Sequence, residues 1–220
     1  MTDNFKQYEE YMRSFGVIPE KKDKSGEYYF SVSIIRRGKD HPELPAANRT
    51  FATFYYSNLE KYIRSVEDIR KMCDVFGCRA YGTVVPKNKE RLLKQIIVSS
   101  AKQMYINEFK SPWRIVEHCS DIMVLDIKRW VVDVDDVEED SPLVNELKQI
   151  ISQCDSKAEN PVDTIFPTKS GVHIITYPFN LNQFSYKLIE RGIATSEDKA
   201  KKMIKEMVKK NHLTLLYENL

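Results

Sequence analysis

The chain has 220 residues, of which 42% are hydrophobic and 11% aromatic, so it can bury a sizeable core. No apolar run reaches the roughly 20 residues that a transmembrane helix needs, and the acidic, amphipathic N-terminal segment is unlike a secretory signal. Composition therefore predicts an intracellular, cytoplasmic protein without a membrane partner. The net charge is only +2, so the total charge does not by itself indicate nucleic-acid binding.

The first half of the chain mixes helical spacing with strand-like alternation. A Ser65-x-x-Asp68 pattern predicts a helix start, and Gly77 predicts the end of that helix. Asn88 is the predicted cap of the next helix, whose inward residues would be Leu92, Leu93, Ile96 and Ile97. The predicted elements are, in order, a helix over 4–15, paired strands over 28–37 and 50–56, a helix from Ser65 to about Phe76, a strand over 78–85 and a helix over 89–106.

The second half begins with RWVVDVDD, residues 129–136, the clearest strand pattern in the chain. The elements predicted after it are a helix from Pro142 to about Gln153, a strand over 163–168, the strand GVHIITY from Gly171, a helix within 181–192, a helix capped by Thr195 or Ser196 and a strand over 212–218. Because no regular βαβ period, GxGxxG pattern or P-loop is present, the fold class is predicted to be α+β with mixed or antiparallel sheets.

Four cysteines are present and none forms a CxxC pair. His118-Cys119 could join Cys73 and Cys78 in a zinc site, although this spacing is unlike that of common zinc ribbons and fingers. The alternative is that these cysteines and Cys154 are reduced thiols packed as small hydrophobic side chains.

Asp133 and Asp135 stand at the end of the 129–136 strand, within the acidic run DVDDVEED. Strand residues i and i+2 point to the same face, so the two carboxylates should project together. Their repulsion would be relieved by a cation, and carboxylate oxygens suit Mg²⁺ or Mn²⁺, with substrate phosphates completing the shell. The alternative is a strand that simply runs into a solvated acidic loop. An EF-hand is excluded, because Glu138 occupies the position that requires glycine.

His173 lies near the start of the GVHIITY strand, just after Gly171. A lone histidine on a strand is often a satisfied core residue. Gly171, however, would let a backbone or a phosphate approach closely, and Lys169 and Ser170 offer an ammonium and a hydroxyl group that suit triphosphate oxygens.

Together, Asp133-Val-Asp135 and Gly171-Val-His173 resemble the first two motifs of the archaeo-eukaryotic primase superfamily, the primase-polymerases. The resemblance implies one primase-polymerase-like domain, with an N-terminal α/β unit over 1–110 packed on an RRM-like unit over 111–220 that carries both motifs. It also implies that Asp133 and Asp135 bind Mg²⁺ or Mn²⁺ and that His173 contacts the incoming nucleotide. The implied activity is template-dependent DNA primase or polymerase chemistry.

The family's third motif, a hydrophobic residue followed by Asp, has no match in the last strand. Glu218 is the only acidic residue there and is the candidate third metal ligand. Without such a ligand, the protein would be a catalytically degenerate primase-like module that binds nucleic acid or assists replication. The resemblance implies three partners, namely a single-stranded DNA or RNA template, nucleoside triphosphates and a replicative helicase. A free-standing primase of this size fits phage or plasmid replication.

Basic residues supply further candidate contacts. Arg79 could contact template or triphosphate, or could form an ordinary ion pair at a strand edge. The candidates for binding the phosphate backbone are Arg36, Arg37, Lys39, Lys87, Lys89 and Arg91. Solvated loops and helix faces are the alternative for these charges.

A rival enzyme class is suggested by His212-Leu-Thr214, which matches the His-x-Thr element of two-histidine phosphoesterases. Those enzymes need two such elements. The only other candidate element, His173-Ile-Ile-Thr176, has one residue too many, so Thr176 lies on the opposite face of the strand from His173.

Overall fold

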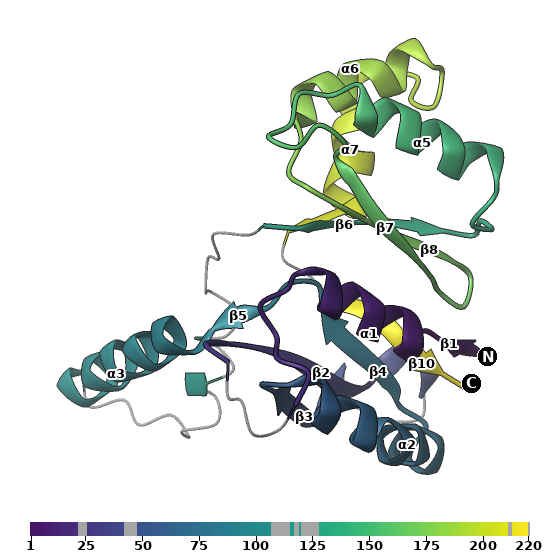
Figure 1. The fold of residues 1–220 in the computed structure, drawn as a ribbon. Coiled ribbons are helices and arrows are strands. Elements are labelled where there is room, and N and C mark those ends of the chain that lie inside the picture. The colour runs from purple at the N-terminus through teal and green to yellow at the C-terminus, as the bar shows by residue number, and fades with distance from the viewer. Residues whose placement is uncertain are drawn as a thin grey trace.

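The structure is a computed structural model that describes residues 1–21, 26–41, 48–106, 115–116, 119, 128–210 and 213–219, apart from the side chain of Lys39. Its described residues form two antiparallel sheets with helices packed on them, which confirms the α+β class (Figure 1). No helix among these residues is long and apolar enough to cross a membrane.

The larger sheet has the strand order β1-β10-β4-β2-β3, with the short strand β5 paired to the start of β2. Its strands are β1 (Thr2–Asp3), β2 (Tyr28–Arg36), β3 (Arg49–Tyr56), β4 (Arg79–Thr83), β5 (Lys87–Asn88) and β10 (Leu213–Glu218). The predicted pairing of the first two long strands is confirmed by β2 and β3.

The smaller sheet has the order β7-β8-β6-β9, and all of its pairings are antiparallel. Its strands are β6 (Trp130–Asp135), β7 (Val162–Pro167), β8 (Gly171–Thr176) and β9 (Val208–Lys210). The final strand β10 does not join this sheet, although the expected RRM-like unit over 111–220 included it. It lies instead between β1 and β4, because its apolar residues complete the core of the larger sheet.

Two cores lie on the two faces of the smaller sheet. The described helices are α1 (Phe5–Ser14), α2 (Leu59–Phe76), α3 (Lys89–Tyr105), α5 (Pro142–Ser152), α6 (Leu181–Glu190) and α7 (Glu197–Met207), together with the 3-10 turn η1 (Gly38–Asp40). Helices α5, α6 and α7 cover one face of the smaller sheet, and α1 lies between the two sheets (Figure 1).

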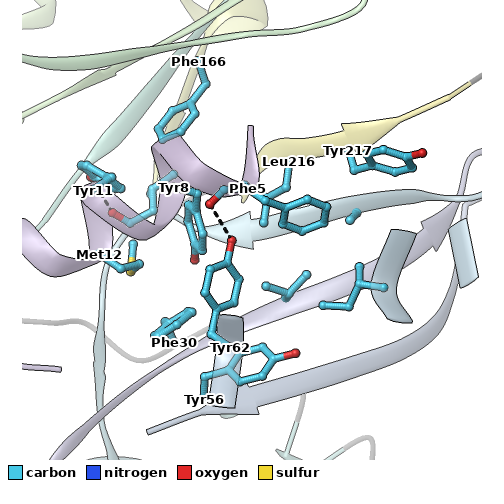
Figure 2. Close-up of a cluster of buried hydrophobic side chains, with 14 of the residues drawn as sticks. Phe5, Tyr8, Tyr11, Met12, Phe30, Tyr56, Tyr62, Phe166, Leu216 and Tyr217 are labelled. Carbon is cyan, nitrogen blue, oxygen red and sulfur yellow. Dashed lines mark hydrogen bonds between the residues drawn. The ribbon is translucent and has the colours of Figure 1, made fainter. Parts of the chain in front are cut away.

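Aromatic side chains of α1 join the two sheets into one core. Tyr8 and Tyr11 pack against Phe166 of β7, as Figure 2 shows. Their hydroxyl groups donate to the carbonyls of Thr83 and Val84, each at 2.8 Å, so these polar groups are satisfied inside the core. The two sheets are thereby held at a fixed distance, which matters for any site formed between them.

Two predictions about helices were wrong. Helix α2 begins after Asn58, whose side chain accepts a hydrogen bond from the backbone of Lys61, and Ser65 lies inside the helix. Helix α3 is capped by Asn88 as predicted, but Leu93 and Ile97 are exposed, and no residue of α3 is buried among the described residues. The apolar spacing correctly predicted a helix but not a covered face, because α3 projects away from both sheets (Figure 1).

Candidate functional site

Strands β6 and β8 bring together the two motifs that the sequence singled out. In their antiparallel register Asp133 lies opposite His173, and Asp135 lies opposite Gly171. Residues that face each other across such a pair project from the same side of the sheet. The carboxylates of Asp133 and Asp135 and the imidazole of His173 are therefore neighbours on one face.

This face is the one turned toward the larger sheet. Val131 and Ile175, which share it by strand parity, belong to the core between the sheets, and so does Phe166. Along β6 the face changes from buried Val131 to exposed Asp135. The acidic pair therefore stands at the margin of the core, where the face opens to solvent.

His173 is held at both ring nitrogens. Its Nε2 atom lies 3.3 Å from Oδ1 of Asp133, and its Nδ1 atom lies 3.0 Å from the hydroxyl oxygen of Thr214. Thr214 belongs to β10, so the second contact crosses from the smaller sheet to the larger one. His173 is 8% exposed, which makes it a buried residue that nonetheless borders the acidic pair.

Arg37 places a positive charge near the same carboxylates. It donates a hydrogen bond of 3.0 Å to the hydroxyl of Tyr81. Burial lowers the pKa of the Arg37 guanidinium, but the hydrogen bond to Tyr81 and the negative charges of Asp40 and Asp133 outweigh burial and raise this pKa. Arg37 therefore stays charged within electrostatic range of Asp133.

Glu218, the candidate third metal ligand, has other partners. Its Oε1 atom lies 2.9 Å from Arg79 and 3.6 Å from Lys169. The carboxylate is 1% exposed and accepts no hydrogen bond of good geometry among the described residues, so these ion pairs are its compensation. Arg79 also makes two hydrogen bonds to Asp40, of 2.6 and 2.8 Å. For Arg79 the structure therefore shows an ion pair, and a buried one rather than one at a strand edge.

Gly171 is required by the neighbouring strand. A Cβ atom at this position would lie 2.0 Å from the carbonyl oxygen of Val134 and 2.9 Å from the Cα atom of Asp135. The close approach expected at this glycine is thus an approach of the β6 backbone. Lys169 and Ser170 lie in the turn before it, where the Ser170 carbonyl accepts from the backbone of Val137.

An open pocket of about 480 Å³ lies between this turn and the chain that leaves β6. It is lined by Pro167, Thr168, Lys169, Ser170 and Gly171 on one side and by Asp136, Val137, Glu138 and Glu139 on the other. The acidic wall disfavours a bare triphosphate and favours one that is accompanied by cations. Asp136 adopts the left-handed backbone region, with φ of 59°.

The remaining basic candidates are spread over β2 and its neighbours. Arg36 lies over the ring of Phe51, with 5.4 Å from its Cζ atom to the ring centroid. Lys87, Lys89 and Arg91 lie in β5 and at the start of α3, beside the first residues of β2, whereas Arg36 and Arg37 lie at its far end. They therefore do not form one basic surface. The side chain of Lys39 lies outside the described part of the chain.

Sequence reasoning missed two contacts, that of Thr214 with His173 and that of Asp40 with Arg79; it had considered Thr214 only as part of the His212-Leu-Thr214 element. Apart from Tyr217, Thr214 is the one hydroxyl residue of LTLLY, and a small polar residue in a buried strand is the signal that could have found it. Asp40 follows the basic run RRGK, which suggested a phosphate contact and not an internal ion pair.

Asp133 and Asp135 offer two carboxylates to a divalent cation such as Mg²⁺ or Mn²⁺, but not a complete set of ligands. Among the described residues, no Lys or Arg forms an ion pair with Asp135, and no group of three or more His, Cys, Asp or Glu side chains is placed to hold a metal. Two carboxylates on one face suffice for Mg²⁺ or Mn²⁺ when substrate phosphates supply the other oxygens. Asp133 and Asp135 fit that arrangement, whereas Glu218 is committed to Arg79.

The two alternatives from the sequence remain predictions. The four cysteines are free and buried, as expected for packed thiols, but His118 of the zinc hypothesis lies outside the described residues. His212 of the phosphoesterase hypothesis does too. Thr176 is fully buried, three residues along β8 from His173.

Comparisons with protein-family models, with curated proteins and with solved structures found no match for this chain.

Proposed function

We propose that the protein is a metal-dependent nucleotidyl transferase of the primase-polymerase type, which initiates or extends a nucleic-acid strand from nucleoside triphosphates. The supporting observation is the register of β6 and β8, which sets Asp133 directly opposite His173 with Asp135 on the same face. Two carboxylates beside an imidazole, at the open margin of a core, could hold a divalent cation next to a phosphate group, which supports phosphoryl transfer.

Each residue has a role in this proposal. Asp133 and Asp135 would hold Mg²⁺ or Mn²⁺, which when bound neutralises charge on the triphosphate. Lys169, Ser170 and His173 would bind the phosphates, with Arg37 as a further cation near Asp133. The 3′ hydroxyl of the strand loses its proton to solvent and its oxygen attacks the α-phosphorus. The bond from that phosphorus to the oxygen that bridges to the β-phosphate breaks, and pyrophosphate leaves.

A second candidate function is a catalytically degenerate primase-like module that binds single-stranded nucleic acid. The observation that favours it is the commitment of Glu218 to Arg79, at 2.9 Å and 1% exposure. In this second proposal Glu218 serves as the partner of Arg79 and not as a third carboxylate beside Asp133 and Asp135. Both functions imply a single-stranded DNA or RNA template, and a replicative helicase is a partner of either.

Nucleotide incorporation on a single-stranded template, with labelled NTPs or dNTPs and Mg²⁺ or Mn²⁺, tests the proposal. The variants are Asp133→Ala with Asp135→Ala and, as a matched control, Asp198→Ala with Glu206→Ala, which removes the same charge from exposed positions of α7. We expect metal-dependent incorporation that the first pair abolishes and the control pair retains. Template binding without incorporation by the wild type would support the degenerate module instead.

A further inference from the structure

His173 is the point where the two sheets meet in the candidate site. Its Nδ1 atom lies 3.0 Å from the hydroxyl of Thr214, and its Nε2 atom lies 3.3 Å from Oδ1 of Asp133. Thr214 is 0% exposed, so its hydroxyl cannot be exchanging this contact for one with bulk water. A fully buried hydroxyl that meets a ring nitrogen is a defined polar contact between the apolar residues Leu213 and Leu215.

We propose that Thr214 is a positioning residue, whose hydroxyl donates to Nδ1 and holds neutral His173 in the tautomer that carries its proton on Nε2. The consequence for nucleotide binding rests on the proposed function, whereas the tautomer itself does not. In this arrangement the Nε2–H group of His173 faces Asp133 and the Asp-x-Asp face.

The two neighbours of the ring determine the tautomer. An ionised carboxylate can only accept, so Asp133, at 3.3 Å, favours a hydrogen on the nitrogen that faces it but does not fix the tautomer alone. Nδ1 is then left with a lone pair, and it needs a donor because an unpaired buried acceptor is unfavourable. The Thr214 hydroxyl can rotate to supply that hydrogen.

The fold makes Thr214 suitable for this task. In β10 it pairs with Gly82 of β4, and the strand is hydrogen-bonded on both sides, to β1 and to β4. Its position is therefore fixed by the larger sheet, independently of the β7–β8 turn. Through Thr214 the last strand contributes a hydroxyl to the site, four residues before Glu218, the residue that the resemblance suggested as a metal-binding carboxylate.

Nitrogen-15 NMR of the imidazole groups tests the proposal directly, because the Nδ1 and Nε2 shifts differ between the tautomers. The spectrum is recorded at alkaline pH, in the range where the two nitrogen shifts no longer change with pH. The protein has four histidines, and the resonances of His173 are assigned as those that are lost in the His173→Gln variant. We expect wild-type His173 to show a protonated Nε2 and an unprotonated Nδ1.

Thr214→Val removes the hydroxyl at nearly constant volume, and Thr214→Ser retains it. We expect Thr214→Val to move the Nδ1 and Nε2 shifts of His173 toward each other, as the two tautomers mix, and Thr214→Ser to restore the wild-type pattern. The matched control is Thr176→Val on β8, where the buried Thr176 hydroxyl has no hydrogen-bond partner among the described residues. This control should leave the His173 shifts unchanged.

A wild-type His173 with its proton on Nδ1 would overturn the proposal, and this result needs no variant to fold. Unchanged shifts in a folded Thr214→Val protein would overturn it as well. Nucleotide incorporation is measured separately from the NMR spectra. If the wild type incorporates nucleotides, Thr214→Val should lower incorporation roughly tenfold, with recovery in Thr214→Ser. If the wild type does not incorporate them, the proposed function fails while the tautomer measurement still decides the role of Thr214.

Discussion

Two clusters of charged side chains differ in how completely the protein compensates them. In the first cluster Arg79 contacts Asp40 at 2.6 Å and Glu218 at 2.9 Å, and all three side chains are at most 12% exposed. In the second cluster Asp133 is 33% exposed and has His173 beside it, while Asp135 is exposed. The first cluster is closed within the protein, and the second leaves negative charge facing solvent.

This difference separates a structural role from a functional one. Charges that are buried must be paired, and a closed cluster such as that of Arg79 ties β4, η1 and β10 together without needing a ligand. Asp133 and Asp135 project together from one face, where a cation would relieve their repulsion. The comparison can be tested by changing each cluster and measuring stability and activity separately.

The largest loss of stability is expected from Arg79→Met, which keeps the length of the side chain and removes its charge. The buried carboxylate of Glu218 and the half-buried one of Asp40 would lose their main cation, and breaking a buried ion pair in this way costs about 3–5 kcal/mol. Urea unfolding measures the change. Arg13→Met is the control, because its ion pairs with Glu9 and Glu20 are at the surface and should contribute far less. Equal losses in both variants would show that the Arg79 cluster is not a structural unit.

Gly171→Ala tests the strand pair that carries the second cluster. The new methyl group would lie 2.0 Å from the carbonyl oxygen of Val134, so β6 and β8 must separate, at a cost of roughly 2–3 kcal/mol in the free energy of unfolding. Gly16→Ala is the comparison, because nothing lies within 4 Å of its added Cβ and only the positive φ is unfavourable. We expect Gly171→Ala to be the more harmful change in urea unfolding. A smaller effect than that of Gly16→Ala would contradict this close approach of the two strands.

Glu218→Gln distinguishes the two roles that have been considered for this carboxylate. If the Glu218 carboxylate serves as the partner of Arg79, Glu218→Gln should lower the free energy of unfolding by about 1–3 kcal/mol. The reason is that a neutral buried amide then replaces a buried charge beside a cation. The metal concentration needed for half-maximal incorporation should then stay unchanged. A third metal ligand would behave in the opposite way, with a higher metal requirement and little change in urea unfolding. Asp135→Asn is the positive control for the metal requirement.

Much of this arrangement could be predicted from local sequence pattern. Alternation along RWVVDVDD and GVHIITY gave β6 and β8, and strand parity placed Asp133 and Asp135 on one face. These inferences succeeded because they depend on neighbouring residues. The predicted helix start at Ser65 also relied on local pattern, and it was wrong because Asn58, seven residues earlier, caps the same helix.

The contacts across the two sheets could not be predicted in this way. The position of β10 between β1 and β4 depends on pairings across at least 130 residues, which no local pattern encodes. For that reason the sequence indicated neither the Thr214 contact with His173 nor the commitment of Glu218 to Arg79. It assigned β10 to the unit of the smaller sheet, and Glu218 therefore seemed free to serve the acidic pair.

Asp136 provides the smallest and most local test of the second cluster. It follows the acidic pair directly and is the one non-glycine residue with positive φ among those described. Asn and Asp tolerate this left-handed region, whereas a β-branched side chain does not, so Asp136→Val should lower stability by about 1–2 kcal/mol. Asp136→Asn removes the same charge, and we expect it to stay within about 0.5 kcal/mol of the wild type. The difference between the two variants in urea unfolding isolates the backbone effect. Equal stabilities would mean that the chain leaves β6 without the turn at Asp136, and the acidic wall of the pocket would then not be fixed beside Lys169 and Ser170.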